Sequence, residues 1–311
     1  MLQEPTEFED SMSSESRLFG AIEAGGTKFV CAIGDESGTI HEELRFPTAD
    51  PASTLAQACA FLKDRGGDPL RAIGAACFGP VILDRRSPHY GFIGKTPKIG
   101  WNNVDIAGLL SREFSCPIGF DTDVNAAALA EQGWGAGRDI DNLVYLTVGT
   151  GIGGGVIVGG LPVHGLMHPE IGHVYPRRHP LDVNFAGICP FHGDCLEGLA
   201  SGPAIVARAG SDLAHLDPAH VQWELQADYL GQLCAQLVLT VSPQRIIIGG
   251  GVMSQDRLFP LVRQRMQHWL AGYVDRPEIL GADRYLVPPA LGAQSGVLGA
   301  LKLAVSAARG A

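Results

Sequence analysis

Long hydrophobic runs and an excess of positive charge are both missing from this chain of 311 residues. No stretch of about 18 consecutive apolar residues occurs, so no membrane-spanning helix is expected. Lysine and arginine together number 23, against 33 aspartates and glutamates, which gives a formal net charge of −10. Surfaces that bind nucleic acids are normally basic, so this balance argues against a nucleic-acid partner.

The amino terminus lacks the features of a targeting segment. Residues 1–17 are polar and acidic, without the basic start and apolar core that define a signal peptide. We therefore expect a disordered tail over residues 1–17. The remainder predicts a globular protein with a sizeable core, because 46% of the residues are hydrophobic and 18% are charged. The length leaves room for about two domains.

Cysteine is scarce, with seven residues, an odd number. Five of the seven lie in apolar patterns, which predict buried thiols in a reducing cytoplasm. These five are Cys31, Cys59, Cys77, Cys116 and Cys234. The other two, Cys189 and Cys195, lie close to histidines and indicate a different role.

Segment 166–197 gathers two thiols and two imidazoles. Cys189, His192 and Cys195 follow one another in a Cys-x2-His-x2-Cys spacing, which lets one turn present all three side chains. His173 lies sixteen residues before the first of them. Two thiolates and two imidazoles are the number and type of ligands that a tetrahedral structural zinc site uses. The sequence therefore predicts a loop that is closed by a bound zinc ion.

Two carboxylates flank these ligands. Glu170 lies in the loop that the metal would close, and Glu197 follows Cys195 by two positions. A bound metal would hold the two carboxylates at a set distance from each other. The alternative is a flexible polar loop with incidental cysteines and histidines. The metal-bound loop is favoured, because such clustering of soft ligands is uncommon in a chain with seven cysteines.

Glycine, in contrast, is abundant, and its 41 residues cluster in three places. Residues 18–34 and 143–158 each predict a strand, a tight glycine turn and a second strand. With an offset of 124 residues, Gly25 superimposes on Gly149, which suggests an internal duplication. The alternative is chance, because glycine hairpins can resemble one another.

The glycine turns indicate a nucleotide cleft. Backbone N–H groups approach a phosphate closely where no side chain intervenes, so two facing hairpins could grip a polyphosphate from both sides. Neither is a Walker A loop, because Gly25-Gly26-Thr27-Lys28 lacks the preceding glycine at the required spacing. The third cluster, Gly249-Gly250-Gly251, follows another predicted strand and supports the same interpretation.

Asp123 lies where a predicted strand passes into a helix. A carboxylate at the mouth of a phosphate-binding cleft can accept the proton of a hydroxyl that attacks a phosphoryl group. An aspartate before a helix is otherwise most often an N-cap. With Asp121 and Asn125 beside it, the catalytic interpretation is favoured.

Together these motifs resemble the ROK sugar kinases, a family of the actin–hexokinase-like superfamily. The resemblance covers nearly the whole chain from Phe19 onward. It rests on two phosphate motifs, the catalytic aspartate, and a sugar- and zinc-binding signature. The matching segments are, in that order, Glu23–Lys28, Thr147–Gly155, Thr122–Asn125, Glu170–His173 and Cys195–Glu197. The last two carry the family's most specific signature.

Two departures from the usual family pattern resemble the bacterial fructokinase subgroup. Glu23 replaces the usual aspartate, and His192 replaces one of three cysteines. Segments 28–34 and 189–203 are also similar to that subgroup. The resemblance implies ATP-dependent phosphorylation of D-fructose to fructose 6-phosphate by a cytoplasmic homodimer that uses Mg²⁺ and structural Zn²⁺. The alternatives are a glucokinase, a mannokinase or an N-acetylhexosamine kinase of the same family.

The resemblance also implies a role for each matching residue. Asp123 would be the general base, and Glu23 would reach Mg²⁺ through a water molecule. The sugar hydroxyls would contact Asn102, Glu170, His173 and Glu197. Zinc would be held by His173, Cys189, His192 and Cys195. ATP would contact Gly25, Gly26, Thr27, Lys28, Thr147, Gly149, Thr150, Gly151, Gly153, Gly202, Pro203, Gly249, Gly250 and Gly251.

The expected architecture is a two-lobed α/β fold of the actin–hexokinase-like (ribonuclease H-like) type with a cleft between its domains. The first domain is expected over 18–120 with 291–311, and the second, with the zinc loop, over 121–290. Closure of the two lobes would exclude water from phosphoryl transfer. The family also contains repressors with a helix-turn-helix module before the first strand. Because about eighteen residues precede Phe19 and the net charge is negative, a DNA-binding regulator is not favoured.

Overall fold

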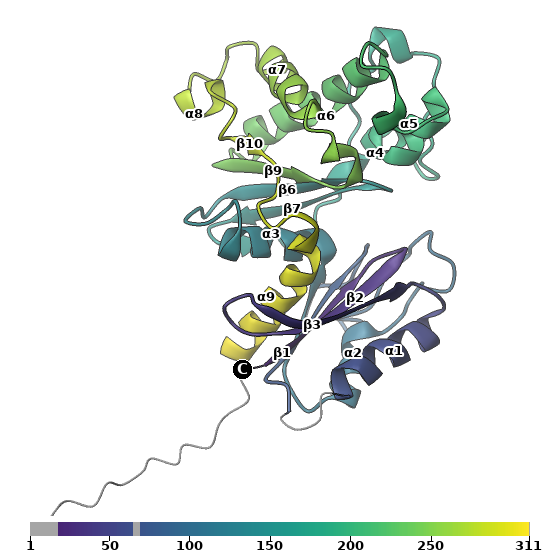
Figure 1. The fold of residues 1–311 in the computed structure, drawn as a ribbon, viewed down its shortest axis with the longest axis vertical. Helices are drawn as coiled ribbons and strands as arrows, with labels where there is room; N and C mark the ends of the chain where they lie inside the picture. Colours follow the sequence, from purple (N-terminus) through teal and green to yellow (C-terminus); the bar gives the residue numbers. More distant parts are fainter. Residues whose placement is uncertain (1–17, 65–68, 311) are drawn as a thin grey trace, which may run out of the picture.

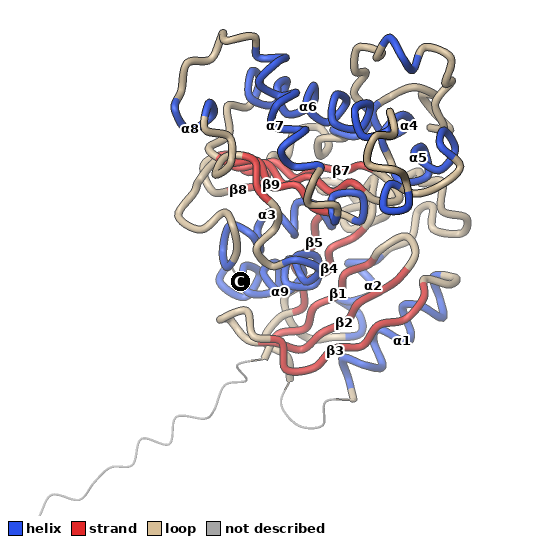
Figure 2. The backbone as a smooth tube through the Cα atoms, turned by 45° about the horizontal axis from the view of Figure 1, so that its top comes forward, coloured by secondary structure: helices blue, strands red, loops and turns tan. Residues whose placement is uncertain are grey.

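Two five-stranded mixed sheets form the frame of the molecule, one in each half (Figure 1). The structure is a computed structural model and describes residues 18–64 and 69–310. The expected tail over residues 1–17 lies outside the described residues. Helices accompany both sheets, which confirms the predicted α/β class (Figure 2). The domain boundaries after residues 120 and 290 stay a prediction.

The first sheet has the strand order β3-β2-β1-β4-β5. Its strands are β1 (Phe19–Ala24), β2 (Lys28–Gly34), β3 (Ile40–Pro47), β4 (Ile73–Cys77) and β5 (Ile118–Thr122). β1 is antiparallel to β2 and parallel to β4, and β4 is parallel to β5. Every residue of β4 is buried, as expected for a central strand with helices on both faces. Helices α1 (Pro51–Lys63) and α2 (Ile106–Glu113) pack on one face, and α9 (Ser295–Arg309) packs on the other.

The second sheet repeats this topology, with the order β8-β7-β6-β9-β10. Its strands are β6 (Leu143–Val148), β7 (Ile152–Val158), β8 (Leu161–Pro162), β9 (Arg245–Gly249) and β10 (Leu286–Val287). β6 takes the place of β1, because it is antiparallel to β7 and parallel to β9. The hairpin turns differ by one residue, since residues 25–28 lie between the last paired residues of β1 and β2, and residues 149–151 between those of β6 and β7. The shared topology agrees with the internal duplication that the sequence suggests.

Helix α3 (Asp123–Trp134) and helix α9 lie between the two sheets (Figure 1). Glycines let these helices approach the strands closely. A Cβ atom on Gly74 of β4 would lie 1.9 Å from the carbonyl oxygen of Ala300, and one on Gly155 of β7 would lie 2.3 Å from that of Val124. The segment that leads into α9 is held by the buried carboxylate of Glu131 in α3. This carboxylate accepts hydrogen bonds from the backbone N–H groups of Ala290 and Leu291 and from the Ser295 hydroxyl.

The remaining helices lie on the outer side of the second sheet. They are α4 (Leu196–Ala200), α5 (Gly202–Ala209), α6 (Gln222–Thr240), α7 (Leu258–Leu270) and α8 (Pro277–Leu280). An aspartate followed by a proline predicts a helix start, with the aspartate as cap and the proline as first residue, and Asp50 and Pro51 begin α1 in this way. The pair Asp217 and Pro218 predicts a helix start as well, but α6 begins at Gln222, and Asp217 instead closes a separate turn by accepting from the N–H of Ala219.

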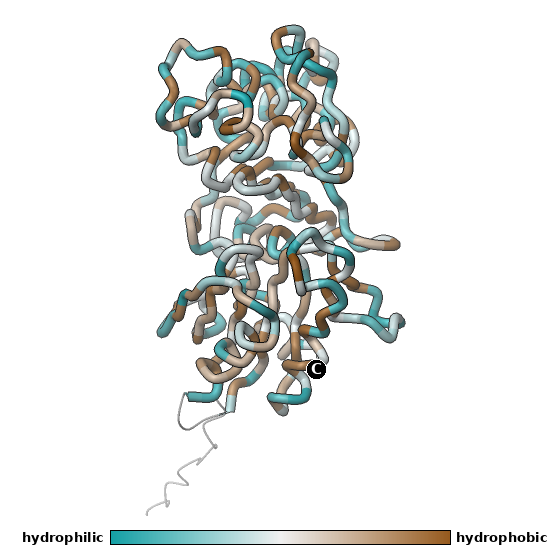
Figure 3. Tube along the Cα trace, turned by 90° about the vertical axis from the view of Figure 1, so that its right-hand side faces the viewer, coloured by the Kyte–Doolittle hydropathy of each residue, from teal (hydrophilic) through white to brown (hydrophobic). Residues whose placement is uncertain are grey.

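Hydrophobic and hydrophilic segments alternate along the backbone in both halves of the molecule (Figure 3). Each sheet accordingly has its own buried apolar core, and smaller clusters join α3 and α9 to the strands. Within the described part of the chain, no helix combines the length and apolar character needed to cross a membrane. The ends of β1, β5 and β6 carry the candidate site between these cores.

Candidate active site

Asp123 is the first residue of α3 and does not cap that helix. The N-cap is Thr122, whose hydroxyl oxygen accepts the N–H of Asn125 at 3.0 Å. One oxygen of the Asp123 carboxylate accepts the N–H of Val124 at 2.9 Å. The N-cap interpretation of Asp123 is therefore wrong, and most of its hydrogen-bonding capacity remains available for chemistry.

The pKa of Asp123 is raised to about 7, chiefly by burial and to a smaller extent by the carboxylates of Glu23 and Glu170, against the opposing hydrogen bond from the Val124 N–H. Burial also raises the pKa of Glu23, which the positive charges of Lys28 and Arg45 oppose. The structure thus places Asp123 in the electrostatic field of two other carboxylates. A carboxylate with a pKa near neutrality is well matched to proton transfer at physiological pH.

Asp121 supports the end of β5. Its buried carboxylate accepts hydrogen bonds from the N–H of Thr122, the amide of Asn125 and the imidazole of His164, at 2.7, 2.7 and 2.9 Å. The hydrogen bond to Asp121 raises the pKa of His164. The two aspartates that flank Thr122 therefore differ in their hydrogen bonding. The Asp121 carboxylate accepts from three donors, whereas the Asp123 carboxylate accepts from the N–H of Val124.

The second glycine turn meets two other glycine segments. The N–H of Gly149 donates to the carbonyl of Gly151 at 2.9 Å and closes the turn, and the N–H of Gly202 donates to the carbonyl of Gly149 at 2.8 Å. Gly250, with φ of +93°, lies so near β6 that a Cβ atom would be 2.4 Å from the Val148 carbonyl oxygen. The structure thus brings together the second hairpin, the start of α5 and the end of β9, as the predicted nucleotide site requires.

The first glycine turn is closed by a hydrogen bond from the N–H of Gly25 to the carbonyl of Lys28, at 3.0 Å. Thr27 and Lys28 are exposed at its tip. Glu23 precedes the turn, and a Cβ atom on Gly296 would lie 2.4 Å from its carboxyl carbon. Glu23 therefore lies at the first turn of α9, where the helix dipole favours a negative charge.

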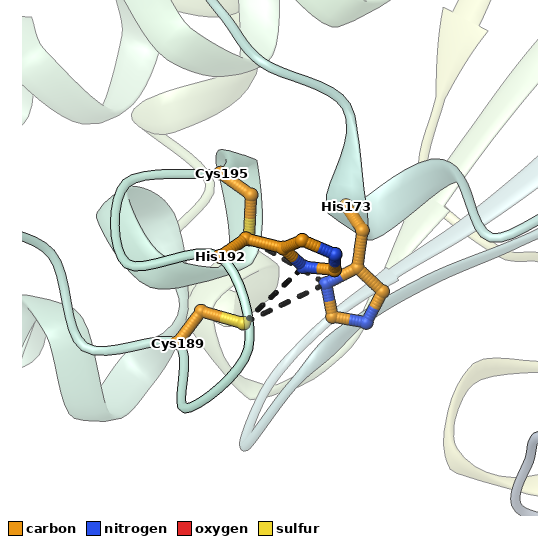
Figure 4. Close-up of side chains that lie close together, drawn as sticks. All are labelled: His173, Cys189, His192 and Cys195. Atoms are coloured by element: carbon orange, nitrogen blue, oxygen red, sulfur yellow. Dashed lines mark hydrogen bonds between the residues drawn. The ribbon is translucent and has the colours of Figure 1, made fainter.

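The four predicted metal ligands converge (Figure 4). Their ligand atoms all lie within 4.8 Å of one another. The Nδ1 atom of His173 is 3.5 Å from the sulfur of Cys195 and 3.8 Å from that of Cys189, and the Nδ1 atom of His192 is 3.6 Å from the Cys189 sulfur. Zinc bonds of about 2.3 Å to sulfur and about 2.0 Å to nitrogen, at tetrahedral angles, separate such atoms by about 3.6 Å. The cluster therefore fits a tetrahedral zinc ion.

Glycines hold the metal loop against the second hairpin. A Cβ atom on Gly172, between Glu170 and His173, would lie 1.8 Å from the carbonyl oxygen of Ile152. On the other side, one carboxylate oxygen of Glu197 accepts the N–H of Ile152 at 2.9 Å. Both segments of the signature thus contact the first residue of β7. Glu197 is a structural partner of the second glycine hairpin, which the sequence did not reveal.

Asn102 lies outside this network. Its side-chain oxygen accepts the N–H of Thr96 at 2.7 Å, which closes the loop before buried Trp101 and leaves the residue exposed. The predicted contact of Asn102 with a sugar stays a prediction. A residue that sequence reasoning missed is His168, whose imidazole accepts the N–H of Val81 at 3.1 Å. Only its position two residues before Glu170 could have signalled it.

Comparison with known proteins decides the family, because the model of the ROK family matches residues 19–307. The chain belongs to the ROK family. A fructokinase of Zymomonas mobilis is 44% identical to this ROK protein, over 95% of this chain and 99% of that protein. A fructokinase of Streptococcus mutans is also 44% identical, over 93% and 98%.

A solved structure supports the same assignment. A ROK hexokinase from Thermus thermophilus superimposes on this ROK protein with a TM-score of 0.76 at 28% identity, and the match covers 94% of this chain and 100% of that chain. This likeness confirms the predicted two-lobed actin–hexokinase-like α/β fold.

Proposed function

We propose that this ROK protein transfers the γ-phosphoryl group of ATP to the 6-hydroxyl of D-fructose. The observation that carries the proposal is Asp123, a carboxylate with a pKa near 7 beside two glycine hairpins and the Glu170 signature. Fructokinase relatives at 44% identity over nearly the full length of the chain support the choice of substrate. Glucose, mannose and N-acetylhexosamines are the competing substrates.

In the proposed reaction Asp123 takes the proton of the 6-hydroxyl while that oxygen forms a bond to the γ-phosphorus. The bond from phosphorus to the bridging oxygen breaks, and ADP leaves with the electron pair. A base with a pKa near 7 is deprotonated in a large fraction of molecules at neutral pH and still accepts a proton effectively. Orientation of the sugar by Glu170, His173 and Glu197 would supply the near-attack geometry.

The nucleotide would bind at the converging glycines of the second half. Because Gly149–Gly151, Gly202 and Gly249–Gly251 carry no side chains, its phosphates could approach the backbone closely there, and the start of α5 adds the positive end of a helix. The exposed Lys28 and the first glycine turn would face the same polyphosphate. Glu23 would hold Mg²⁺ through a water molecule. Mg²⁺ supplies neutralisation of the charge on the phosphates.

Zinc in the cluster of His173, Cys189, His192 and Cys195 would be structural, because protein atoms supply all four ligands. It would fix Glu170 and Glu197 at the sugar site. A homodimer is proposed on family resemblance. A cytoplasmic location is proposed because none of the seven cysteines forms a disulfide, which suits a reducing compartment.

Steady-state assays across a panel of hexoses test the proposed activity. With ATP and Mg²⁺ present, we expect kcat/KM for D-fructose to exceed that for glucose, mannose and N-acetylglucosamine by about tenfold or more, since a pocket built to bind particular hydroxyls rejects sugars that lack them. ADP release and identification of fructose 6-phosphate provide the measurement. A clear preference for another hexose would identify that sugar, and not fructose, as the substrate. The absence of turnover with any hexose would refute the proposed kinase activity.

Gly151→Val is expected to raise the KM values for ATP and for fructose together, each by about tenfold, as for loss of a hydrogen bond to a charged group. A Cβ atom at Gly151 would lie 2.6 Å from a carboxylate oxygen of Glu197, so Glu197 must move and release the N–H of Ile152. Gly165→Val is a matched control, because a Cβ atom there meets only an ordinary contact at 3.8 Å. Unchanged KM values in a folded Gly151→Val protein would show that the hairpin serves packing alone.

A further inference from the structure

A buried histidine connects the two halves of the molecule beside the candidate site. The Nε2 atom of His168 accepts the N–H of Val81 at 3.1 Å, across a sequence separation of 87 residues. Val81 follows β4 in the first half, and His168 lies in the loop before the Glu170 signature in the second half. His168 is 5% exposed. A buried hydrogen bond of this kind fixes the relative position of the two segments.

The donor in this hydrogen bond determines the tautomer of the ring. A backbone N–H can only donate, so Nε2 of His168 carries no proton and the neutral ring has its proton on Nδ1. Nδ1 lies 3.4 Å from the carbonyl oxygen of Pro169 and 3.6 Å from Oε1 of Glu170. The ring therefore presents a donor toward the Glu170 carboxylate, at a distance just beyond a direct hydrogen bond.

Gly79 leaves the space that both side chains occupy. A Cβ atom there would lie 3.3 Å from Cε1 of His168 and 3.6 Å from Oε1 of Glu170. The surrounding contact is loosely packed, with a cavity of about 190 Å³ between the segment after β4 and the loop before His168. Leu166 and Met167 in that loop are exposed. The hydrogen bond from Val81 therefore attaches this loop to the first half beside the cavity.

We propose that His168 is a positioning residue, which attaches the loop before Glu170 to the first half of the molecule and so orients the Glu170 carboxylate for the sugar. This inference rests on the proposed hexose kinase activity. Glu170 would bind the sugar equally in the ground state and the transition state, so displacing it raises the KM for the sugar and changes kcat little. ATP would bind at other residues, so the KM for ATP should change little.

His168→Ala is expected to raise the KM for the preferred hexose by about tenfold, the usual effect of losing one buried hydrogen bond, with the KM for ATP and kcat changed by less than about threefold. Steady-state kinetics with each substrate varied in turn provide the measurement. A hexose KM that stays within about twofold of the wild type would refute the proposal, as would equal increases in both KM values.

Two conservative substitutions separate the two contacts of the ring. Glutamine places an acceptor where Nε2 lies and can keep the hydrogen bond from Val81, whereas asparagine places its amide near Nδ1 and loses that bond. Because the Nδ1 contact is the longer one, we expect His168→Gln to restore the hexose KM to within about threefold of the wild type. His168→Asn should resemble His168→Ala. Recovery of the hexose KM in His168→Asn but not in His168→Gln would contradict the proposal. The same two variants test the proposal if His168→Ala does not fold.

His179 offers a matched control. It is also buried, accepts the N–H of Leu181 through one ring nitrogen at 3.2 Å and faces Glu224 with the other at 3.5 Å, but it packs against α6 away from the candidate site. His179→Ala should lower the melting temperature and leave the hexose KM unchanged. If it raises the hexose KM as much as His168→Ala does, the effect is general destabilisation and the proposal fails.

A spectroscopic measurement distinguishes failure of this inference from failure of the kinase assignment. Nitrogen-15 NMR of labelled wild-type protein, without substrates, should show His168 as the neutral tautomer protonated on Nδ1. Detection of the Nε2-protonated tautomer would overturn the inference even if fructose is phosphorylated. If no hexose is phosphorylated, the proposed function fails. The positioning role is then tested by measuring direct hexose binding to the wild-type and His168→Ala proteins. Equal affinities of the two proteins would refute that role.

Discussion

Asp123→Asn is expected to lower kcat by about 100-fold or more, which is the usual effect of losing a general base. Asparagine keeps the size of the side chain, and its carbonyl oxygen can still accept the N–H of Val124. The start of α3 should also persist, because Thr122 supplies the cap. Only the capacity to take up a proton is lost, so the KM values for ATP and fructose should change little.

The pH dependence of kcat/KM adds a second signature of the same residue. Burial raises the pKa of Asp123 to about 7, so the carboxyl group is increasingly protonated, and inactive as a base, as the pH falls below that value. We expect kcat/KM of the wild type to fall about tenfold for each pH unit below this pKa. The Asp123→Asn variant should not show this decrease at acid pH.

The control for this substitution is Asp50→Asn, at the start of α1. Asp50 caps α1, and asparagine caps a helix equally well, so both stability and kcat should be preserved. Circular dichroism and thermal unfolding would establish that Asp123→Asn is folded. If the folded variant keeps more than half of the wild-type kcat, Asp123 is not the base.

Local sequence patterns predicted the parts of the site that are built within one segment. The glycine turns follow from the spacing of apolar strands around Gly25 and Gly149, because strand and turn preferences act over a few residues. The metal cluster follows from ligand type and spacing in the same way, since Cys189, His192 and Cys195 lie in one turn. Asp123 was found because it stands at a strand-to-helix junction.

Contacts between segments distant in sequence could not be predicted in the same way. The hydrogen bond from Val81 to His168 and that from Ile152 to Glu197 depend on how segments far apart in the sequence are placed in space, which no periodic pattern records. The identity of a helix cap is ambiguous in sequence for a simpler reason. Neighbouring polar residues such as Thr122 and Asp123 both suit a helix start, and only backbone geometry separates them.

Cys195→Ser is expected to remove zinc from the protein and to lower its free energy of unfolding by several kcal/mol, as for loss of a structural metal site. Cys195 is fully buried and lies between His173 and the start of α4, so its replacement removes one of four ligands at the centre of the cluster. A serine hydroxyl is a poor zinc ligand. Cys195 is also the N-cap of α4, where serine is favourable, so the substitution does not itself weaken the helix.

The kinetic consequence of zinc loss should be unequal for the two substrates. Glu170 and Glu197 flank the cluster, whereas the glycines proposed to hold ATP belong to the strands and α5, so the KM for fructose should rise more than the KM for ATP. Metal analysis of purified wild-type protein should give about one zinc per chain, lost in Cys195→Ser and retained in Cys116→Ser, a half-buried thiol outside the cluster. A wild type that is free of zinc and fully active would show that the loop is held by protein contacts alone.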